Sequence, residues 1–220
     1  MAAMSAGDPA LDEGWIEREL ATELPDLRLA SVTVPGGPRR SPPELRARLG
    51  MLADRFHGAR ALSIRREAVP AAYRVLFRHL GLDPDVHRTP IEAAAVQRLL
   101  RGGFASGGAV EDACLLALVE TGVPVWALDA ARVDGPLGLR AARPGERLGH
   151  GAYADDLAPG RIVVADGAGP VAVLFGETAA GRLPRRETTR LLLYAVGAPG
   201  VPALYFEEAL YCCAEALDEA

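Results

Sequence analysis

The densest basic run in the sequence lies in its C-terminal quarter and is a candidate for binding phosphate. It contains Arg182, Arg185, Arg186 and Arg190, and Glu187 lies within it. A guanidinium group is planar and presents several N–H donors, which suits the oxygen atoms of phosphate and carboxylate groups. The alternative is a solvated surface on which these charges hold no ligand.

The histidines and glycines do not form a known catalytic pattern. Residues 102–108 are rich in glycine, but they lack the Lys-Ser/Thr pair of a phosphate-binding loop and follow no expected strand. The spacing around Ser106 also differs from the G-x-S-x-G pattern of hydrolases. Because the histidines are scattered over different expected elements, we expect neither a metal site nor a cofactor. These histidines are His57, His79, His87 and His150.

The cysteines and the charge bear on compartment and partners. Cys114, Cys212 and Cys213 form no C-x-x-C pair, and so small a number is typical of a reducing cytoplasm. We expect Cys114 to be a small buried side chain rather than a nucleophile. The net charge of −5 disfavours avid nonspecific binding to nucleic acid but allows a local arginine surface. Neither a signal peptide nor a membrane-spanning segment is expected.

Apolar periodicity, together with the positions of glycine and proline, predicts helices first and strands second. We expect helices over residues 11–24, 42–56, 69–80, 90–101, 109–121 and 203–217. Thr89, Pro90 and Glu92 form a capping box, which fixes the start of one of them. We expect strands over residues 27–34, 123–128, 137–142, 161–165 and 170–175. Residues 188–196 fit a strand or a helix by pattern.

This order of elements predicts an α+β fold rather than an alternating parallel sheet. The chain has 220 residues, of which 50% are hydrophobic, and this is enough for one good core. We expect an N-terminal extension with a short helix over residues 1–24, followed by a single domain over residues 25–220.

Four segments resemble a known family in the same order. Residues 122–129 (GVPVWALD) are similar to G-x-P-x-H-A-F-D, and residues 139–148 (LRAARPGERL) to V-R-R-A-R-x-G-E-K-L. Residues 162–173 are similar to L-V-I-A-D followed by G-P-I-A-L, and residues 187–193 (ETTRLLL) to E-T-T-N-V-L-L. Together they resemble the editing domain of the phenylalanyl-tRNA synthetase beta subunit, and looser matches extend the resemblance to residues 60–200.

The resemblance implies a fold and an activity. The family domain has a β-sandwich-like core with flanking helices and hydrolyses tyrosine wrongly attached to phenylalanine tRNA. This chain would then be a free-standing hydrolase that removes a mischarged or non-protein amino acid from tRNA. The alternatives are a non-catalytic module that binds tRNA, an amino acid or a nucleoside, and a domain that binds a partner through residues 203–217. The catalytic core of the synthetase is absent, so we expect no aminoacylation.

The resemblance also implies site residues. The family histidine is replaced by Trp126, whose ring could form a pocket wall, stack on adenine or simply pack in the core. The family glutamate, which reads the tyrosyl hydroxyl, is best matched by Glu177, with Glu187 as the alternative. We assign Glu177 the catalytic role.

The remaining assignments concern substrate and tRNA. Residues 105–111 align with an asparagine-rich loop beside the family pocket, where backbone N–H groups could hold the substrate. The expected substrate-binding residues are Trp126, Ser106, Gly107, Gly108 and Asp129. The expected tRNA-binding residues are Arg182, Arg185 and Arg186. The sequence leaves the oligomeric state open.

Overall fold

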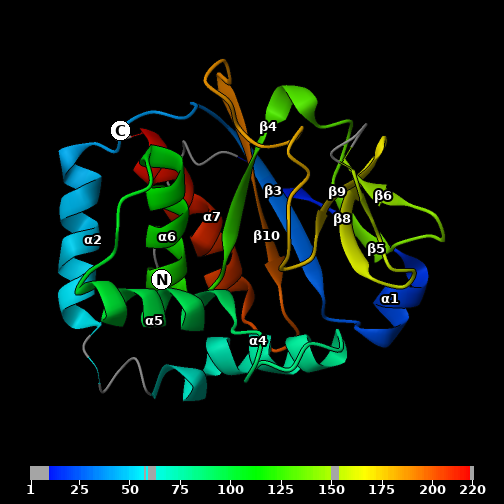
Figure 1. The fold of residues 1–220 in the computed structure, drawn as a ribbon, viewed down its shortest axis with the longest axis horizontal. Helices are drawn as coiled ribbons and strands as arrows, with labels where there is room; N and C mark the ends of the chain where they lie inside the picture. The colour runs from blue at the N-terminus through cyan, green and yellow to red at the C-terminus, as the bar shows by residue number, and fades with distance from the viewer. Residues whose placement is uncertain (1–9, 57, 59–62, 150–153, 219–220) are drawn as a thin grey trace.

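Two four-stranded β-sheets form the centre of the structure, and helices lie around them (Figure 1). This computed structural model describes residues 10–56, 58, 63–149 and 154–218. Sheet A contains, in spatial order, β1 (Asp12–Glu13), β3 (Arg28–Pro35), β10 (Arg190–Gly197) and β4 (Val125–Asp129). Sheet B contains β2 (Trp15–Ile16), β5 (Gly138–Ala141), β8 (Ile162–Asp166) and β9 (Gly169–Val173). A separate pair contains β6 (Arg147–Leu148) and β7 (Asp155–Asp156).

The helices make the fold α+β. The described α-helices are α1 (Arg18–Glu23), α2 (Pro43–Arg55), α4 (Ala68–His79), α5 (Pro90–Arg101), α6 (Ala109–Thr121) and α7 (Ala203–Asp218). Two short 3₁₀ helices are η1 (Ile64–Arg66) and η2 (Ala130–Arg132). Helix α7 packs against α6 and against β10, β3 and β4, while α2 and α5 pack against α6.

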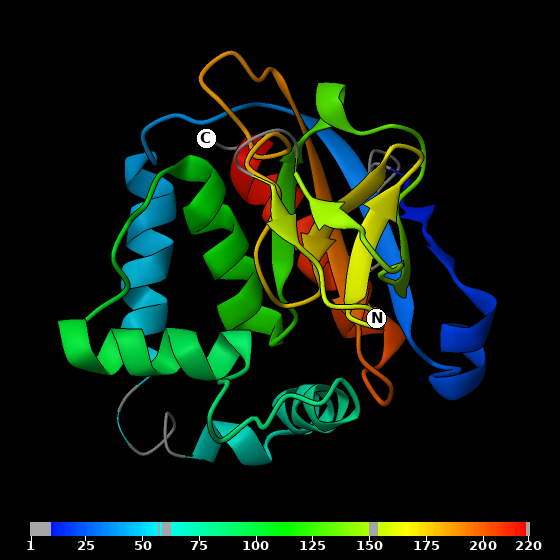
Figure 2. The ribbon, with the colours of Figure 1, turned by 45° about the vertical axis from the view of Figure 1, so that its right-hand side comes forward.

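Side-chain alternation along β10 divides the core into two layers. Leu191 and Leu193 are fully buried on one side of sheet A. Gly197 lies on the same side, where an added Cβ would come within 3.1 Å of the Phe206 ring of α7. The alternate residues, including Tyr194, therefore face away from α7 and toward sheet B. Figure 2 shows the yellow strands of sheet B in front of the blue and orange strands of sheet A.

Most predicted elements are confirmed, with ends that differ by about two residues. The segment that fitted either a strand or a helix forms strand β10. It pairs antiparallel with β3 on one side and with β4 on the other, so it lies inside sheet A. The short elements β6, β7, η1 and η2 were not predicted, because two or three residues are too few to show a period.

The helix predicted over residues 11–24 is wrong in its first half. Strands β1 and β2 occupy its start, and helix α1 is confined to Arg18–Glu23. The Gly14 N–H donates to the Leu29 carbonyl oxygen at 2.8 Å. Strand β1 pairs with β3 and strand β2 with β5, so this backbone is hydrogen-bonded to both sheets instead of within a helix. Residues 1–9 of the predicted extension lie outside the described residues.

A buried ion pair joins the start of α5 to α4. The Arg74 guanidinium donates to Glu92 Oε1 and to Asp85 Oδ1, both at 2.6 Å. The other Glu92 oxygen accepts the Thr89 N–H at 3.1 Å and the Thr89 hydroxyl at 2.8 Å. The predicted capping box is therefore confirmed, and its glutamate also compensates a buried arginine.

Substitution Thr89→Ala should lower the free energy of unfolding by about 1–2 kcal/mol, because it removes a helix cap. Thr89 is fully buried, so its lost hydrogen bond is not replaced by water. The measurement is urea denaturation followed by circular dichroism. The control is Thr22→Ala on α1, where an exposed hydroxyl donates to the Arg18 carbonyl oxygen at 2.8 Å. Equal losses in the two variants would show that the cap contributes nothing specific.

Candidate functional site

An aromatic cluster lies between sheet A and the turn that follows β9. Trp126 of β4 and Tyr194 of β10 are cross-strand partners, and their rings stack with centroids 5.3 Å apart. Trp126 also contacts Phe175 at 5.8 Å. Phe175 in turn contacts Tyr73 and Phe77 of α4, at 5.9 and 4.8 Å. Trp126 is half-buried in this cluster.

The turn after β9 is tight and carries Glu177. Phe175 has φ of +57°, the left-handed region that a residue with a side chain adopts at a cost of about 1–2 kcal/mol. Two backbone hydrogen bonds close the turn. The Val173 N–H donates to the Glu177 carbonyl oxygen at 2.8 Å, and the Gly176 N–H donates to the Val173 carbonyl oxygen at 2.9 Å. The structure thus brings Trp126 next to this turn through Phe175. The Glu177 side chain is exposed and has no polar partner among the described residues.

Tyr194 is a fixed neutral wall of the cluster. Burial raises the pKa of its hydroxyl, and a hydrogen bond with the Thr178 side chain offsets part of that rise. The hydroxyl therefore stays protonated at neutral pH and cannot act as a base. The Tyr73 hydroxyl is also buried and donates to the Val196 carbonyl oxygen at 2.7 Å.

The glycine-rich loop before α6 is tied to that helix. Asp112, which is 1% exposed, accepts hydrogen bonds from the Ser106 hydroxyl at 2.6 Å and the Gly107 N–H at 2.9 Å. An added Cβ at Gly108 would lie 2.8 Å from Glu111 Oε2, so a second carboxylate lies beside the loop. The Gly107 N–H is thus engaged within the protein, and the local charge is negative.

Cys114 of α6 faces α7 and is half-buried rather than buried as predicted. Its Sγ lies 3.8 Å from Cys213 Sγ. This contact, together with burial, raises the pKa of the Cys213 thiol. Because only a thiolate is a strong nucleophile, this rise disfavours a nucleophilic role for Cys213.

Asp129 ties the end of β4 to the turn before β10. It is 7% exposed and accepts the Thr188 hydroxyl at 2.8 Å and the Ala131 N–H at 3.1 Å. Thr188 Oγ1 in turn accepts the Arg185 N–H at 2.9 Å. Arg132 lies 3.4 Å from the Asp129 carboxylate. In this structure, Asp129 therefore fixes the backbone at the top of sheet A.

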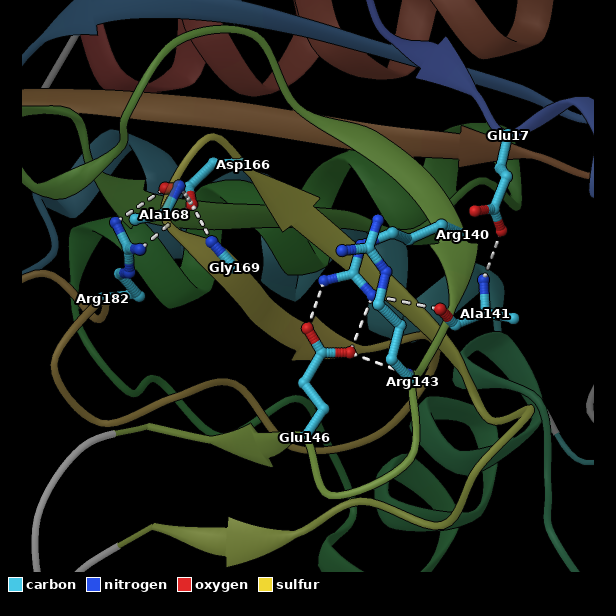
Figure 3. A network of polar contacts seen from close by, with 9 residues as sticks. All are labelled: Glu17, Arg140, Ala141, Arg143, Glu146, Asp166, Ala168, Gly169 and Arg182. Atoms are coloured by element: carbon cyan, nitrogen blue, oxygen red, sulfur yellow. Dashed lines mark hydrogen bonds and ion pairs between the residues drawn. The ribbon is translucent and has the colours of Figure 1, made fainter.

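Arg182 is held in a buried ion pair. Its guanidinium contacts both oxygens of Asp166, at 2.7 and 3.1 Å, and the Asp166 side chain is 0% exposed (Figure 3). Asp166 also accepts the N–H groups of Ala168, Gly169 and Asp134 at 2.9–3.1 Å. Arg182 therefore anchors the loop before β10, whereas Arg185 and Arg186 are exposed.

A second ion pair lies at β5, as Figure 3 also shows. Arg140 donates to both oxygens of Glu146, at 2.7 and 2.5 Å, and the Arg143 N–H donates to the same carboxylate at 2.9 Å. The hydrogen bond from Arg140 holds the pKa of Glu146 below its usual value. Both charges come from the resemblance segment 139–148, and they fix its turn.

A pocket of about 270 Å³ lies at the top of sheet A, between η2 and residues 185–190. Its walls include the predicted residues Asp129 and Arg185. They also include Arg190, a phosphate candidate that was not among the expected tRNA-binding residues, and Arg132, which was not predicted as a site residue. Arg190 belonged to the basic run, and Arg132 follows Asp129 by three residues, so their sequence positions were the available signal.

Two further properties of the described residues concern metal-binding side-chain clusters and membrane-spanning helices. Within these ranges, no group of three or more His, Cys, Asp and Glu side chains could hold a metal ion. The described helices also include none with both the length and the apolar character needed to cross a bilayer. His57 and His150 lie outside the described residues.

These features define an α+β protein with an aromatic site beside sheet A and a separate arginine-lined pocket. A stretch of 85 residues is 38% identical to the phenylalanine–tRNA ligase beta subunit of Chromobacterium violaceum. The match covers 38% of this chain and 11% of that subunit. The chain is thus distantly related to a tRNA ligase subunit. No model of a known protein family matches the chain.

Proposed function

We propose that this chain is a trans-editing hydrolase that removes a mischarged or non-protein amino acid from tRNA, on a core of the editing-domain type. The observation that carries the proposal is the contact between Trp126 and Phe175, at 5.8 Å. It joins the segment that resembles G-x-P-x-H-A-F-D to the turn that carries Glu177. The distant relationship to a tRNA ligase beta subunit supports the same assignment.

The aromatic cluster would hold the end of the substrate. The half-buried ring of Trp126 offers a flat apolar face to an aromatic amino acid or to the terminal adenine. Its Nε1–H has no acceptor among the described residues, so it is free to donate to the ester carbonyl oxygen. Such a donor stabilises the oxyanion that forms when the carbonyl is attacked.

Glu177 would hold the attacking water. Its carboxylate takes a proton as the water oxygen bonds to the ester carbon. The bond between that carbon and the ribose oxygen then breaks, and the ribose hydroxyl receives the proton. Ser106, Gly107 and Gly108 precede the N-terminus of α6, whereas Trp126 follows its C-terminus, so they would not contact the group that Trp126 holds. Asp129 would hold the opposite end of β4 in place.

The second candidate is a module that binds the aminoacylated end of tRNA without hydrolysing it. The engaged Gly107 N–H favours this reading, because it removes one expected oxyanion donor. The neutral, buried Tyr194 hydroxyl supplies no base in place of the family histidine.

Incubation of the purified full chain with a panel of mischarged tRNAs separates the two candidates. We expect faster release of at least one amino acid than in buffer. Binding is read from the fluorescence of Trp126 in a Trp15→Phe background, since the chain has 2 tryptophans. Binding without release on any tRNA would establish the module. If the chain shows neither binding nor release with any tRNA, both candidates are excluded.

A further inference from the structure

The pocket at the top of sheet A has arginines on several sides. Arg132 approaches from η2, Arg185 from the turn before β10 and Arg190 from the first position of β10. Arg190 and Leu192 lie on the same face of the strand, because side chains alternate, and both line the pocket. The hydroxyl-bearing residues Thr33 and Thr189 complete this wall.

Two of these arginines carry uncompensated charge. In the part of the chain that the structure describes, neither Arg185 nor Arg190 has an ion-pair partner, and both are exposed. Arg132 is paired with Asp129, whose carboxylate is buried and already hydrogen-bonded to Thr188 and Ala131. With Asp129 and Glu187 also in the wall, three arginines face two carboxylates, so the pocket lining is net positive although the whole chain carries −5.

A second pocket adjoins the first at Arg132. This pocket of about 310 Å³ is lined by Arg132 and by Arg182, together with Gly149, Pro170, Ala179 and Gly181. Arg132 thus belongs to both pockets. Asp166 already compensates the Arg182 charge, so the arginines without an ion-pair partner among the described residues of these walls, Arg185 and Arg190, belong to the first pocket.

We propose that the pocket lined by Arg132, Arg185 and Arg190 binds a phosphate group. This phosphate belongs to the backbone of tRNA close to its aminoacylated end, an assignment that rests on the proposed function. Trp126 and Asp129 are three residues apart on β4, so the aromatic cluster and the pocket are separated by roughly 10 Å. A tRNA whose aminoacylated end lies at Trp126 therefore places one of its phosphate groups within reach of the pocket.

Glu187 gives the proposal an internal sign test. It lines the same pocket and carries the opposite charge, so it repels a phosphate. Removal of this carboxylate should tighten phosphate binding, whereas removal of the arginines should weaken it. If these side chains only stabilised the loop, removing the glutamate and removing the arginines would not change phosphate binding in opposite directions.

The experiment measures binding of fluorescent, deacylated tRNA to the full chain by anisotropy, between about 50 and 200 mM salt. The double variant Arg185→Gln/Arg190→Gln should bind roughly tenfold more weakly at low salt, with a log–log salt slope smaller by about 1 to 2. Glu187→Gln should bind more tightly than the unsubstituted chain. Because all three side chains are exposed, circular dichroism spectra should not change.

The matched control removes the same charge elsewhere. Arg46 and Arg101 are exposed on α2 and α5 and line none of the pockets described above. Arg46→Gln/Arg101→Gln should change the affinity by less than about threefold. Equal weakening in both double variants would overturn the proposal, because binding would then depend only on net charge.

A second arm identifies the source of the phosphate. Inorganic phosphate should raise the melting temperature of the unsubstituted chain more than that of Arg185→Gln/Arg190→Gln. If this difference appears while tRNA affinity is the same in both proteins, the tRNA assignment is wrong and the pocket holds a free phosphate. If neither probe distinguishes the proteins, the pocket binds no phosphate. A chain that hydrolyses none of the mischarged tRNAs can still show the expected results in both binding arms. The two proposals therefore fail separately.

Discussion

Substitution Asp166→Ala should lower the free energy of unfolding by about 3–5 kcal/mol, because it leaves the buried Arg182 guanidinium without a counter-charge. The Arg182 and Asp166 side chains are only 11% and 0% exposed, so water does not replace the lost contacts. Three backbone N–H groups, at Asp134, Ala168 and Gly169, lose their acceptor at the same time. The measurement is urea denaturation followed by circular dichroism.

The control for this prediction is a solvent-exposed ion pair of the same protein. Asp156, whose side chain is 89% exposed, lies 3.0 Å from Arg147, and Asp156→Ala should cost less than about 1 kcal/mol. The double variant Asp166→Ala/Arg182→Met should recover part of the loss, because no unpaired charge stays buried. A loss in Asp166→Ala as small as that in Asp156→Ala would mean that water screens the Arg182 pair.

The same ion pair positions the candidate site. Residues 174–189 connect β9 to β10 and carry both Glu177 and Arg185. Arg182 is fixed in this segment by Asp166, and its carbonyl oxygen accepts the Asp129 N–H at 2.9 Å. Thr178 is fixed at an earlier point by its hydrogen bond with Tyr194. Loss of the Asp166 anchor should therefore loosen the turn with Glu177 and the arginine pocket together.

Local pattern was sufficient where the chain interacts mainly with its own neighbours. Thr89, Pro90 and Glu92 predicted a helix start because a capping box involves only residues within one turn. Residues 11–24 had a helical period as well, yet Gly14 donates to Leu29 and Trp15 to Pro136. Those partners lie far away in the sequence, so no local pattern contains them.

The candidate site divides in the same way. The order of the resemblance segments pointed to Trp126 and to the turn with Glu177, and the structure places Trp126 in contact with Phe175 of that turn. Their role in a site stays a prediction. Sequence could not distinguish the buried Arg182 from the exposed Arg185, because both belong to one basic run. Arg182 is buried because it pairs with Asp166 at the end of β8. The position of Asp166 beside the basic run depends on the packing of sheet B, which the local sequence does not contain.

Substitution Glu177→Gln should reduce the single-turnover rate of ester hydrolysis by about 10²-fold or more, because the carboxamide cannot accept a proton from water. The substrate should still bind, since the aromatic cluster supplies the contact and is unchanged. The measurement is release of the amino acid from the tRNA that gives the fastest hydrolysis, with the protein in saturating excess. Trp126 fluorescence in the Trp15→Phe background reports binding independently.

Glu187→Gln tests the alternative placement of the family glutamate. Glu187 lines the arginine pocket rather than the aromatic cluster, so its loss should tighten tRNA binding and leave the rate at saturation within about twofold. If Glu187→Gln abolishes hydrolysis and Glu177→Gln does not, the catalytic role belongs to Glu187 and to the pocket at the top of sheet A. The aromatic cluster would then hold only the base or the amino acid side chain. Because both glutamates are exposed, neither substitution should alter stability, and a rate change in either variant reports chemistry rather than unfolding.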